Sequence, residues 1–492
     1  MPALRLQPGR APSLTAVPDA HDGLVSHQTR LIAPQPSAAV GLTRQGLALF
    51  SVGDLGRAEQ AFRTVVEVAP DQAIAWNNLA LVLVALGQAQ QATAALRRSL
   101  GIDAKQLVTW NSLANVLAGL GDIGPAEQAC AAALALDPNC AGAWQTRAFV
   151  RVQAEDFAGA AEAFSRSIDL AGEDAVLYLN LGATLLKCGR FAQAQIAFAT
   201  SLTLDPVSPS AIEFNAICDL IVAAIEGRVT EPKPAQSTQA FKTALLLLNG
   251  ADQSAAAARV AEAWAGAYPD DLEAAHLCDA ALFRAVSRQP AELVAQHFDG
   301  IAEDFEERLV RRLGYRGPER LLSLIAQHLA PKGLLDILDL GCGTGLCAPM
   351  LRPFARRLVG IDLSTRMLTK AKALDLYERL EVADLIAALN HPSEQWDMLI
   401  AADTLPYLGD LEPVFSGAAR VLRSQGWFAF STEAVDGDDF LLQPNGRYSH
   451  GDVYIERLAA HRFQIVQKIS GTLRREAGRA VMGDFFLLRR LA

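Results

Sequence analysis

The chain has 492 residues, an apolar content of 51%, and 44 basic against 54 acidic side chains, which gives a formal charge of −10. Domains usually span about 100–200 residues, so this length predicts more than one folding unit. The acidic balance argues against a nonspecific grip on nucleic acid, because such a grip depends on basic surface. No apolar run approaches the roughly 20 residues of a membrane span, and seven irregularly spaced cysteines favour neither a disulfide framework nor a metal site. We expect a soluble, cytoplasmic protein without a metal.

Residues 1–38 hold several prolines and scattered charges but lack the compact apolar core of a secretory signal. This composition predicts a flexible tail. A targeting or docking segment is the alternative.

A step of 34 residues relates the segments between residues 39 and 206. One position of the step carries a large side chain, a second carries alanine in all five units, and a third carries proline in three of them. The alanine lets paired helices approach closely, and glycine falls at the turn within each pair except the fourth, where Glu155 stands. The recurring residues are Leu42, Trp76, Trp110, Trp144 and Tyr178, then Ala58, Ala92, Ala126, Ala160 and Ala194, then Pro70, Pro138 and Pro206.

This pattern resembles the tetratricopeptide repeat, in five units over residues 39–206. The resemblance implies an all-α superhelix whose concave face binds a protein or peptide partner. A rigid spacer or a dimerisation surface is the alternative. Residues 207–290 are expected to form one degenerate further repeat, with Phe241, Ala257 and Pro269 in the matching positions, and capping helices that bridge to the next domain.

From residue 291 to 492 short apolar runs alternate with helical segments, which predicts an α/β Rossmann-like domain with a doubly wound, seven-stranded sheet. Its last two strands come close together and favour an antiparallel hairpin. The expected strands are 334–340, 357–363, 380–385, 396–402, 426–432, 463–470 and 481–490.

A glycine turn follows the first of these strands. Asp339 comes near the strand's end, and Gly341, Cys342, Gly343 and Gly345 lie in the turn before the first helix. Glycines in this place let the backbone approach a nucleotide. A pyrophosphate cradle has GxGxxG spacing, whereas this turn is GxGxG, so we favour an adenosyl ligand and keep a nicotinamide dinucleotide as the alternative.

The segment DLGCGTG resembles the first motif of class I S-adenosylmethionine-dependent methyltransferases. The resemblance implies that S-adenosyl-L-methionine is the cofactor and that the turn contacts its ribose and methionine portions. Asp362, at the end of the second strand, is placed to accept hydrogen bonds from the ribose hydroxyls, and Leu363 or Met367 to lie against the adenine. A strand-end aspartate can instead form a turn, and Ser364 can cap the following helix.

Two further acids follow the third and fourth strands. In the family that the turn resembles, Asp384 would accept a hydrogen bond from the adenine amino group and Leu385 would offer its backbone amide. Asp403 would lie beside the sulfonium. Ligands of such sheets bind outside the carboxyl ends of the strands, where all these acids fall.

The segment from 297 to 325 resembles the lid helices of the ubiquinone- and biotin-pathway methyltransferases. Phe298, Asp299 and Phe305 take the places of the lid's aromatic and acidic residues, although tyrosine is commoner there. With the LGYR element at Leu313–Arg316 and the repeats, the chain resembles a bacterial group of tetratricopeptide methyltransferases. Phe305 is expected near the cofactor, and Arg316 either pairs with the cofactor's carboxylate or with acids of its own helix.

Residues that handle the methyl acceptor are expected in 443–454, after the fifth strand. This segment brings together Arg447, Tyr448 and His450, and His450 could act as a base near neutral pH or cap the next helix. Tyr407 either faces the same pocket or belongs to the core. We count Tyr407, Tyr448 and His450 as candidate catalytic residues.

Two patterns bear on the acceptor's chemistry. The fourth strand leads into DTLPY and not into the Pro-Pro-aromatic arrangement used on base or amide nitrogens, which disfavours those acceptors. Arg474, Arg475 and Arg479 precede the last strand and either attract an acidic acceptor or, as we expect, form a solvated hairpin tip.

The sequence therefore predicts an S-adenosylmethionine-dependent methyltransferase that acts at oxygen or nitrogen of a protein or peptide recruited by the repeats. A small-molecule methyltransferase whose repeats mediate assembly, or a noncatalytic adaptor that keeps the fold, are the alternatives.

Overall fold

The computed structural model describes residues 37–228, 237–284, 286–307, 309, 313–390, 394–476 and 479–492. The predicted tail lies outside these residues up to position 36, as does most of the break expected at 231–237. The chain divides into two compact units, residues 1–253 and 254–492. The segment 207–290, expected to bridge the two domains, contributes helices to both units. Among the described residues, no helix combines the length and apolar character needed to traverse a bilayer.

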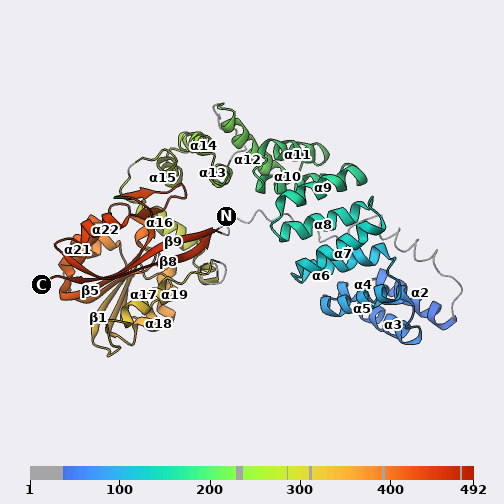
Figure 1. The fold of residues 1–492 in the computed structure, drawn as a ribbon, viewed down its shortest axis with the longest axis horizontal. Coiled ribbons are helices and arrows are strands. Elements are labelled where there is room, and N and C mark those ends of the chain that lie inside the picture. The colour runs from blue at the N-terminus through green and yellow to red at the C-terminus, as the bar shows by residue number, and fades with distance from the viewer. Residues whose placement is uncertain are drawn as a thin grey trace. The chain divides into compact units, whose positions relative to one another are not determined.

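The first unit is a run of antiparallel helix pairs (Figure 1). Five pairs fall on the five predicted repeats, and two further helices follow them. The pairs are α2 (Ser37–Ser51) with α3 (Leu55–Val68), α4 (Ala73–Ala85) with α5 (Ala89–Ile102), α6 (Leu107–Gly119) with α7 (Ile123–Leu136), α8 (Ala141–Gln153) with α9 (Phe157–Ala171) and α10 (Ala175–Lys187) with α11 (Phe191–Leu204), and the further helices are α12 (Pro209–Ile225) and α13 (Thr238–Gly250).

The residues that define the repeat have the expected structural roles. All five recurring alanines are fully buried between helices. The indole N–H groups of Trp76, Trp110 and Trp144 donate to the carbonyl groups of the residues six positions earlier, at 2.8–2.9 Å. Glycines at the turns within the pairs have φ between +72° and +81°, and Glu155 adopts φ +60° in the same place. The 34-residue step thus repeats in backbone conformation as well as in packing.

The second unit begins with α14 (Ser254–Ala267), α15 (Leu272–Ala281) and α16 (Ala291–Ile301) and continues into a mixed sheet. The strands run in the order β3-β2-β1-β4-β5, with all four neighbouring pairs parallel. Strand β9 pairs with β5 and with β8, both antiparallel. The strands are β1 (Leu335–Leu340), β2 (Ala355–Asp362), β3 (Arg379–Val382), β4 (Trp396–Ala401), β5 (Leu422–Ala434), β8 (Phe463–Glu476) and β9 (Arg479–Arg490).

Two short strands are additional to the seven that the sequence predicts. Strands β6 (Phe440–Leu442) and β7 (Tyr448–His450) form a small antiparallel hairpin, and β7 pairs in parallel with the end of β5. Runs of three residues are too short to give a period-2 signal. The hairpin lies in the segment in which we expected residues that handle the acceptor.

Helices cover both faces of the sheet, as the nearly continuous burial of side chains along β1 and β4 requires. Ile337 of β1 and Met398 of β4 belong to one apolar cluster with α17 and α18. Their neighbours Leu338 and Leu399 belong to a second cluster with α20, α21 and α22. The helices of this part of the chain are α17 (Gly317–Ala326), α18 (Ala348–Leu351), α19 (Thr365–Ala373), α20 (Leu385–Asn390), α21 (Glu412–Val421) and α22 (Asp452–Ala459).

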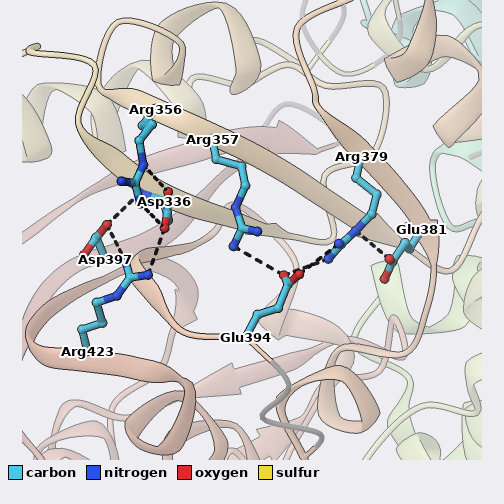
Figure 2. Close-up of polar contacts among 8 residues, drawn as sticks. All are labelled: Asp336, Arg356, Arg357, Arg379, Glu381, Glu394, Asp397 and Arg423. Carbon is cyan, nitrogen blue, oxygen red and sulfur yellow. Dashed lines mark hydrogen bonds and ion pairs between the residues drawn. The ribbon is translucent and has the colours of Figure 1, made fainter.

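A network of ion pairs crosses the amino ends of the parallel strands (Figure 2). The nearly buried carboxylate of Asp336 in β1 accepts from Arg356 of β2 at 2.6 Å and from Arg423 of β5 at 3.0 Å. Arg357, the next residue of β2, pairs at 3.4 Å with Glu394, which also pairs with Arg379 of β3 at 2.9 Å. These pairs join strands β3, β2, β1 and β5 at one edge, and the predicted ligand site lies at the opposite edge.

Candidate cofactor and acceptor site

The glycine turn leaves β1 in a conformation that suits glycine, with φ of +71°, +56° and +89° at Gly341, Gly343 and Gly345. A Cβ atom on Gly341 would lie 2.5 Å from Thr404, and one on Gly345 would lie 2.8 Å from Leu374, so these two glycines are required by packing. A Cβ atom on Gly343 would meet no atom within 4 Å. The middle of the turn therefore borders open space, as a turn that receives a ligand must.

Asp339 lies directly beneath this turn and is almost fully buried. Its carboxylate accepts a hydrogen bond of 2.7 Å from the hydroxyl of Tyr377. Burial raises the pKa of Asp339 to about 7, although the bond from Tyr377 lowers it, and the nearby carboxylate of Asp362 contributes to the rise. Cys342, in the turn itself, is buried, and burial raises the pKa of its thiol.

Asp362 ends β2 and holds the turn to that strand. Its carboxylate accepts from the backbone N–H groups of Gly343 at 2.9 Å and Ser364 at 2.8 Å. Burial raises the pKa of Asp362, and these backbone bonds oppose the rise. Ser364 caps α19 by accepting from the N–H of Met367 at 3.1 Å, so the capping alternative holds for Ser364. Leu363 is half-buried, whereas the side chain of Met367 is fully buried.

Asp384 follows β3 and has partners for both carboxylate oxygens. One oxygen accepts from Arg288 at 2.6 Å, and the other caps α20 through the N–H of Ala387 at 3.0 Å. Burial raises the pKa of Asp384, but the bonds from Arg288 and Ala387 outweigh it and hold the pKa below its usual value. Leu385, the first residue of α20, is half-buried.

Asp403 follows β4 in a left-handed conformation, with φ +53°, which is uncommon for a residue other than glycine and is typical of functional sites. Its N–H donates to the hydroxyl of Ser431 at 2.9 Å. Its carboxylate accepts from Arg447 at 2.6 Å and lies 3.7 Å from Arg474. Burial raises the pKa of Asp403, and the two guanidinium groups limit the rise.

Glu433 of β5 completes a cluster of four charges with these residues, in which Glu433 and Arg474 are buried and Asp403 and Arg447 are only slightly exposed. Its carboxylate accepts from Arg447 and, at 2.6 Å, from Arg474. Despite burial, which raises it, the pKa of Glu433 is lowered by these two arginines. Two arginines thus face two carboxylates, as buried charges require. We call Asp403, Glu433, Arg447 and Arg474 the charge cluster.

The position of Arg474 corrects our expectation that it belongs to a solvated hairpin tip. Only 2% of its side chain is exposed. The register of β8 against β9 shifts between Thr472 and Arg474, so Leu473 and Arg474 both point inward where strict alternation would put one of them in solvent. Arg475 is exposed, and the side chain of Arg479 lies outside the described residues.

Aromatic side chains lie beside the charge cluster. The ring of Tyr407 packs edge-on against Phe298 with 5.4 Å between centroids, and Phe298 packs in the same way against Phe305 at 6.0 Å. Arg447 lies over the ring of Tyr407 at 4.7 Å and donates to its hydroxyl at 2.6 Å. The lid aromatics and Tyr407 therefore share one apolar wall, which ends at the charge cluster.

Two of the candidate catalytic side chains are enclosed in the small hairpin. The imidazole Nε2 of His450 donates to the carbonyl groups of Leu408 at 2.9 Å and Gly409 at 3.2 Å. Burial lowers the pKa of His450 to about 4, although these carbonyl groups raise it. Tyr448 is fully buried in an apolar cluster with Ala280. These contacts support structural roles for both residues.

The lid contributes an acid as well as aromatic rings. Asp299 of α16 accepts from the hydroxyl of Ser364 at 2.5 Å and from the N–H of Arg366 at 3.1 Å. These bonds fasten α16 to the amino end of α19 and lower the pKa of Asp299. Arg316 precedes α17 and is exposed.

The carboxyl edge of the sheet therefore gathers the predicted turn and all four predicted acids. Sequence reasoning missed Arg288, Glu433 and the inward placement of Arg474. Nothing in the sequence around Arg288 or Glu433 marks them as site residues. Their roles follow from their partners in space, because Arg288 pairs with Asp384, 96 residues later, and Glu433 pairs with Arg474, 41 residues later.

Comparison with known proteins agrees with this arrangement. A family model described as a methyltransferase domain matches residues 338–430, and models of the tetratricopeptide repeat match residues 43–106, 107–140 and 175–208. The chain is 32% identical over 121 residues to the ubiquinone biosynthesis O-methyltransferase of Thiobacillus denitrificans, covering 23% of this chain and 50% of that protein. It is 28% identical to the malonyl-[acyl-carrier protein] O-methyltransferase of Salmonella typhimurium, covering 29% and 53%. The chain spans about half the length of these curated relatives.

Two of the solved structures that match the chain each cover part of it. The N-methyltransferase NodS of Bradyrhizobium japonicum, solved with S-adenosyl-L-homocysteine, is 17% identical with a TM-score of 0.33, covering 40% of this chain and 97% of that one. MamA of Desulfovibrio magneticus is 16% identical with a TM-score of 0.34, covering 36% and 99%. Likeness of this degree identifies no ligand or partner. The family models therefore identify tetratricopeptide repeats in the first unit and a methyltransferase domain over residues 338–430 of the second.

Proposed function

We propose that the chain is an S-adenosylmethionine-dependent methyltransferase. The observation that carries the proposal is the turn at Gly343, which borders open space while Asp339, Asp362, Asp384 and Asp403 lie at the surrounding strand ends. The carboxyl groups of Asp339 and Asp362 accept hydrogen bonds from neutral groups, and such carboxyl groups favour a cationic ligand. The related proteins named as methyltransferases support the same activity.

The cofactor, when bound, would supply a methyl group attached to a cationic sulfur, and this sulfur is a good leaving group when a nucleophile attacks the methyl carbon. The chain's own residues then position the two reactants and exclude water. We assign the ribose to Asp362 and the adenine to Leu363, Asp384 and Leu385. Asp403 is assigned to the sulfonium side.

We assign the acceptor to the wall formed by Phe298, Phe305 and Tyr407, next to the charge cluster. Tyr407 lines this wall and is kept protonated, since burial raises its pKa. The buried imidazole of His450 has carbonyl partners for Nε2, so we propose that it supports the loop after β4 and is not the base. An acceptor whose reacting atom already has a free lone pair, such as a carboxylate or a neutral amine, needs no base to activate it.

We further propose that the repeats recruit a protein or peptide that carries the acceptor. Tetratricopeptide arrays present extended concave surfaces suited to peptides and helices. One of the related enzymes is named for an acceptor carried on acyl-carrier protein, which supports an acceptor delivered by a protein.

The substitution Gly343→Asp tests the cofactor site. A side chain at φ +56° is strained, and its carboxylate would enter the space that we assign to the cofactor, so we expect binding of S-adenosylhomocysteine to be lost in calorimetry. Gly227→Asp is the matched control, because Gly227 also has positive φ, +72°, and borders open space in the first unit. Equal affinity in the Gly343 variant and the native chain would rule out the assigned site.

A further inference from the structure

Residues 287–289 form a strap that is bonded to the loop after β4. The carbonyl of Ser287 accepts from Gly409 at 2.8 Å and Asp410 at 2.9 Å, and the N–H of Gln289 donates to Tyr407 at 3.0 Å. Arg288 forms an antiparallel bridge with Leu408. All of these bonds are made by the backbone, so the strap's position does not depend on which side chain stands at 288.

The side chain of Arg288 extends from this strap to a different strand end. Its guanidinium donates to Asp384, which follows β3, at 2.6 Å. The sheet order is β3-β2-β1-β4, so a connection from the loop after β4 to the end of β3 passes the ends of β1 and β2. The glycine turn and Asp362 lie at those two ends.

The helix that follows the strap reaches the remaining strand end. Asp299 of α16 accepts from Ser364, two residues after β2. Residues 287–299 therefore make bonds to the loops after β4, β3 and β2, which surround the turn after β1. Of the side chains in this stretch, Arg288 holds the acid that we assign to adenine.

We propose that Arg288 is a positioning residue of the cofactor site, whose side chain acts as a latch from the backbone-anchored strap to Asp384 and so closes the adenine end of the site. The proposal rests on the proposed function, because it takes Asp384 as the adenine acceptor. One oxygen of Asp384 can accept from the adenine amino group and from Arg288 together, since a carboxylate oxygen has two lone pairs. Bound cofactor leaves when the Arg288–Asp384 pair opens.

The test measures the association and dissociation rate constants of S-adenosylhomocysteine by stopped-flow fluorescence or surface plasmon resonance. We expect Arg288→Ala to raise the dissociation rate constant about tenfold, because a charge-assisted bond is lost. The association rate constant should change by less than about twofold, as affinity differences between close variants usually arise in dissociation. Arg288→Lys should restore part of the loss, since lysine keeps the charge but not the planar fork.

Arg284→Ala is the matched control. Arg284 lies four residues earlier, is more than half exposed and pairs with Asp279, so its loss should leave both rate constants unchanged. Dissociation from Arg288→Ala at the native rate, or a change equal to that of Arg284→Ala, would overturn the latch while leaving the cofactor site intact. If the native chain itself fails to bind S-adenosylhomocysteine, the proposed function fails, and the latch with it.

Discussion

Burial holds the carboxyl group of Asp339 near the midpoint of its titration at neutral pH, because its pKa is raised to about 7. An unfolded aspartate titrates near 3.9. Between these two values the folded state binds more protons than the unfolded state, so the free energy of unfolding falls as pH rises through this window. A cationic ligand above the turn would favour the ionised form and offset this cost.

The substitution Asp339→Asn separates the effect of this buried charge on stability from its effect on ligand binding. We expect it to raise the melting temperature, since it removes a buried charge while leaving an acceptor for Tyr377. The gain should be larger at pH 8 than at pH 5.5, because the native residue becomes ionised between them. Affinity for S-adenosylmethionine should fall. Thermal unfolding at the two pH values and calorimetry measure both effects; a variant less stable than the native chain at pH 8 would contradict the role assigned to burial.

The placement of the acids could be predicted because each lies within two residues of the end of its strand, and a strand end in a parallel sheet is a defined place in space. The charge cluster could not be predicted in the same way. Glu433 and Arg474 belong to strands whose pairing is set by tertiary structure, and the register shift before Arg474 breaks the alternation from which its exposure was inferred. The burial of His450 could not be predicted either, because it depends on a hairpin that is too short to recognise in sequence.

At the scale of elements, the strands are joined differently at their two ends. The amino ends are held by ion pairs, with Asp336 at the centre, and the pKa of Asp336 is lowered, first by its hydrogen bond from Arg356. The carboxyl ends leave room at the turn. This division keeps the residues that stabilise the sheet apart from those that we assign to the ligand.

We expect Asp336→Asn to lower the free energy of unfolding at pH 7 by about 1–3 kcal/mol, because a nearly buried charge-assisted pair is lost. The native pKa is depressed, so the stabilisation is present above the unfolded pKa and is lost as pH falls through the folded pKa. Urea unfolding at pH 7 and pH 4 should therefore show a smaller difference at the lower pH. Asp438→Asn, at an exposed position, is the control, and a pH-independent deficit would argue against the charge as its cause.

For the whole molecule, the sequence predicted the order of repeats and sheet because both rest on periodicities that persist over many residues, 34 in the array and the strand–helix alternation in the second unit. The identity of the acceptor could not be predicted in this way. The family model covers residues 338–430, and three members of the charge cluster lie beyond it.

Labelled cofactor can test the roles that we assign to the two units, recruitment to the repeats and methyl transfer to the second unit. A lysate incubated with the full chain and methyl-labelled S-adenosylmethionine should carry label in its protein fraction, because we assign recruitment to the repeats. A chain that begins at Ser254, the start of the second compact unit, should bind S-adenosylhomocysteine with nearly native affinity but label that fraction poorly. Label confined to small molecules, or equal labelling by the shortened chain, would contradict recruitment; Gly343→Asp provides the blank.

The left-handed turn at Glu155 makes one turn of the array more strained than the others. Four of the five turns within helix pairs use glycine, which adopts positive φ without strain, whereas Glu155 does so at φ +60° against an energetic penalty of roughly 1 kcal/mol. In a stack where each unit contacts only its neighbours, stability is close to a sum of local terms. We therefore expect the turn between α8 and α9 to open first on heating. Opening there separates the first three helix pairs and α8 from the helices that follow.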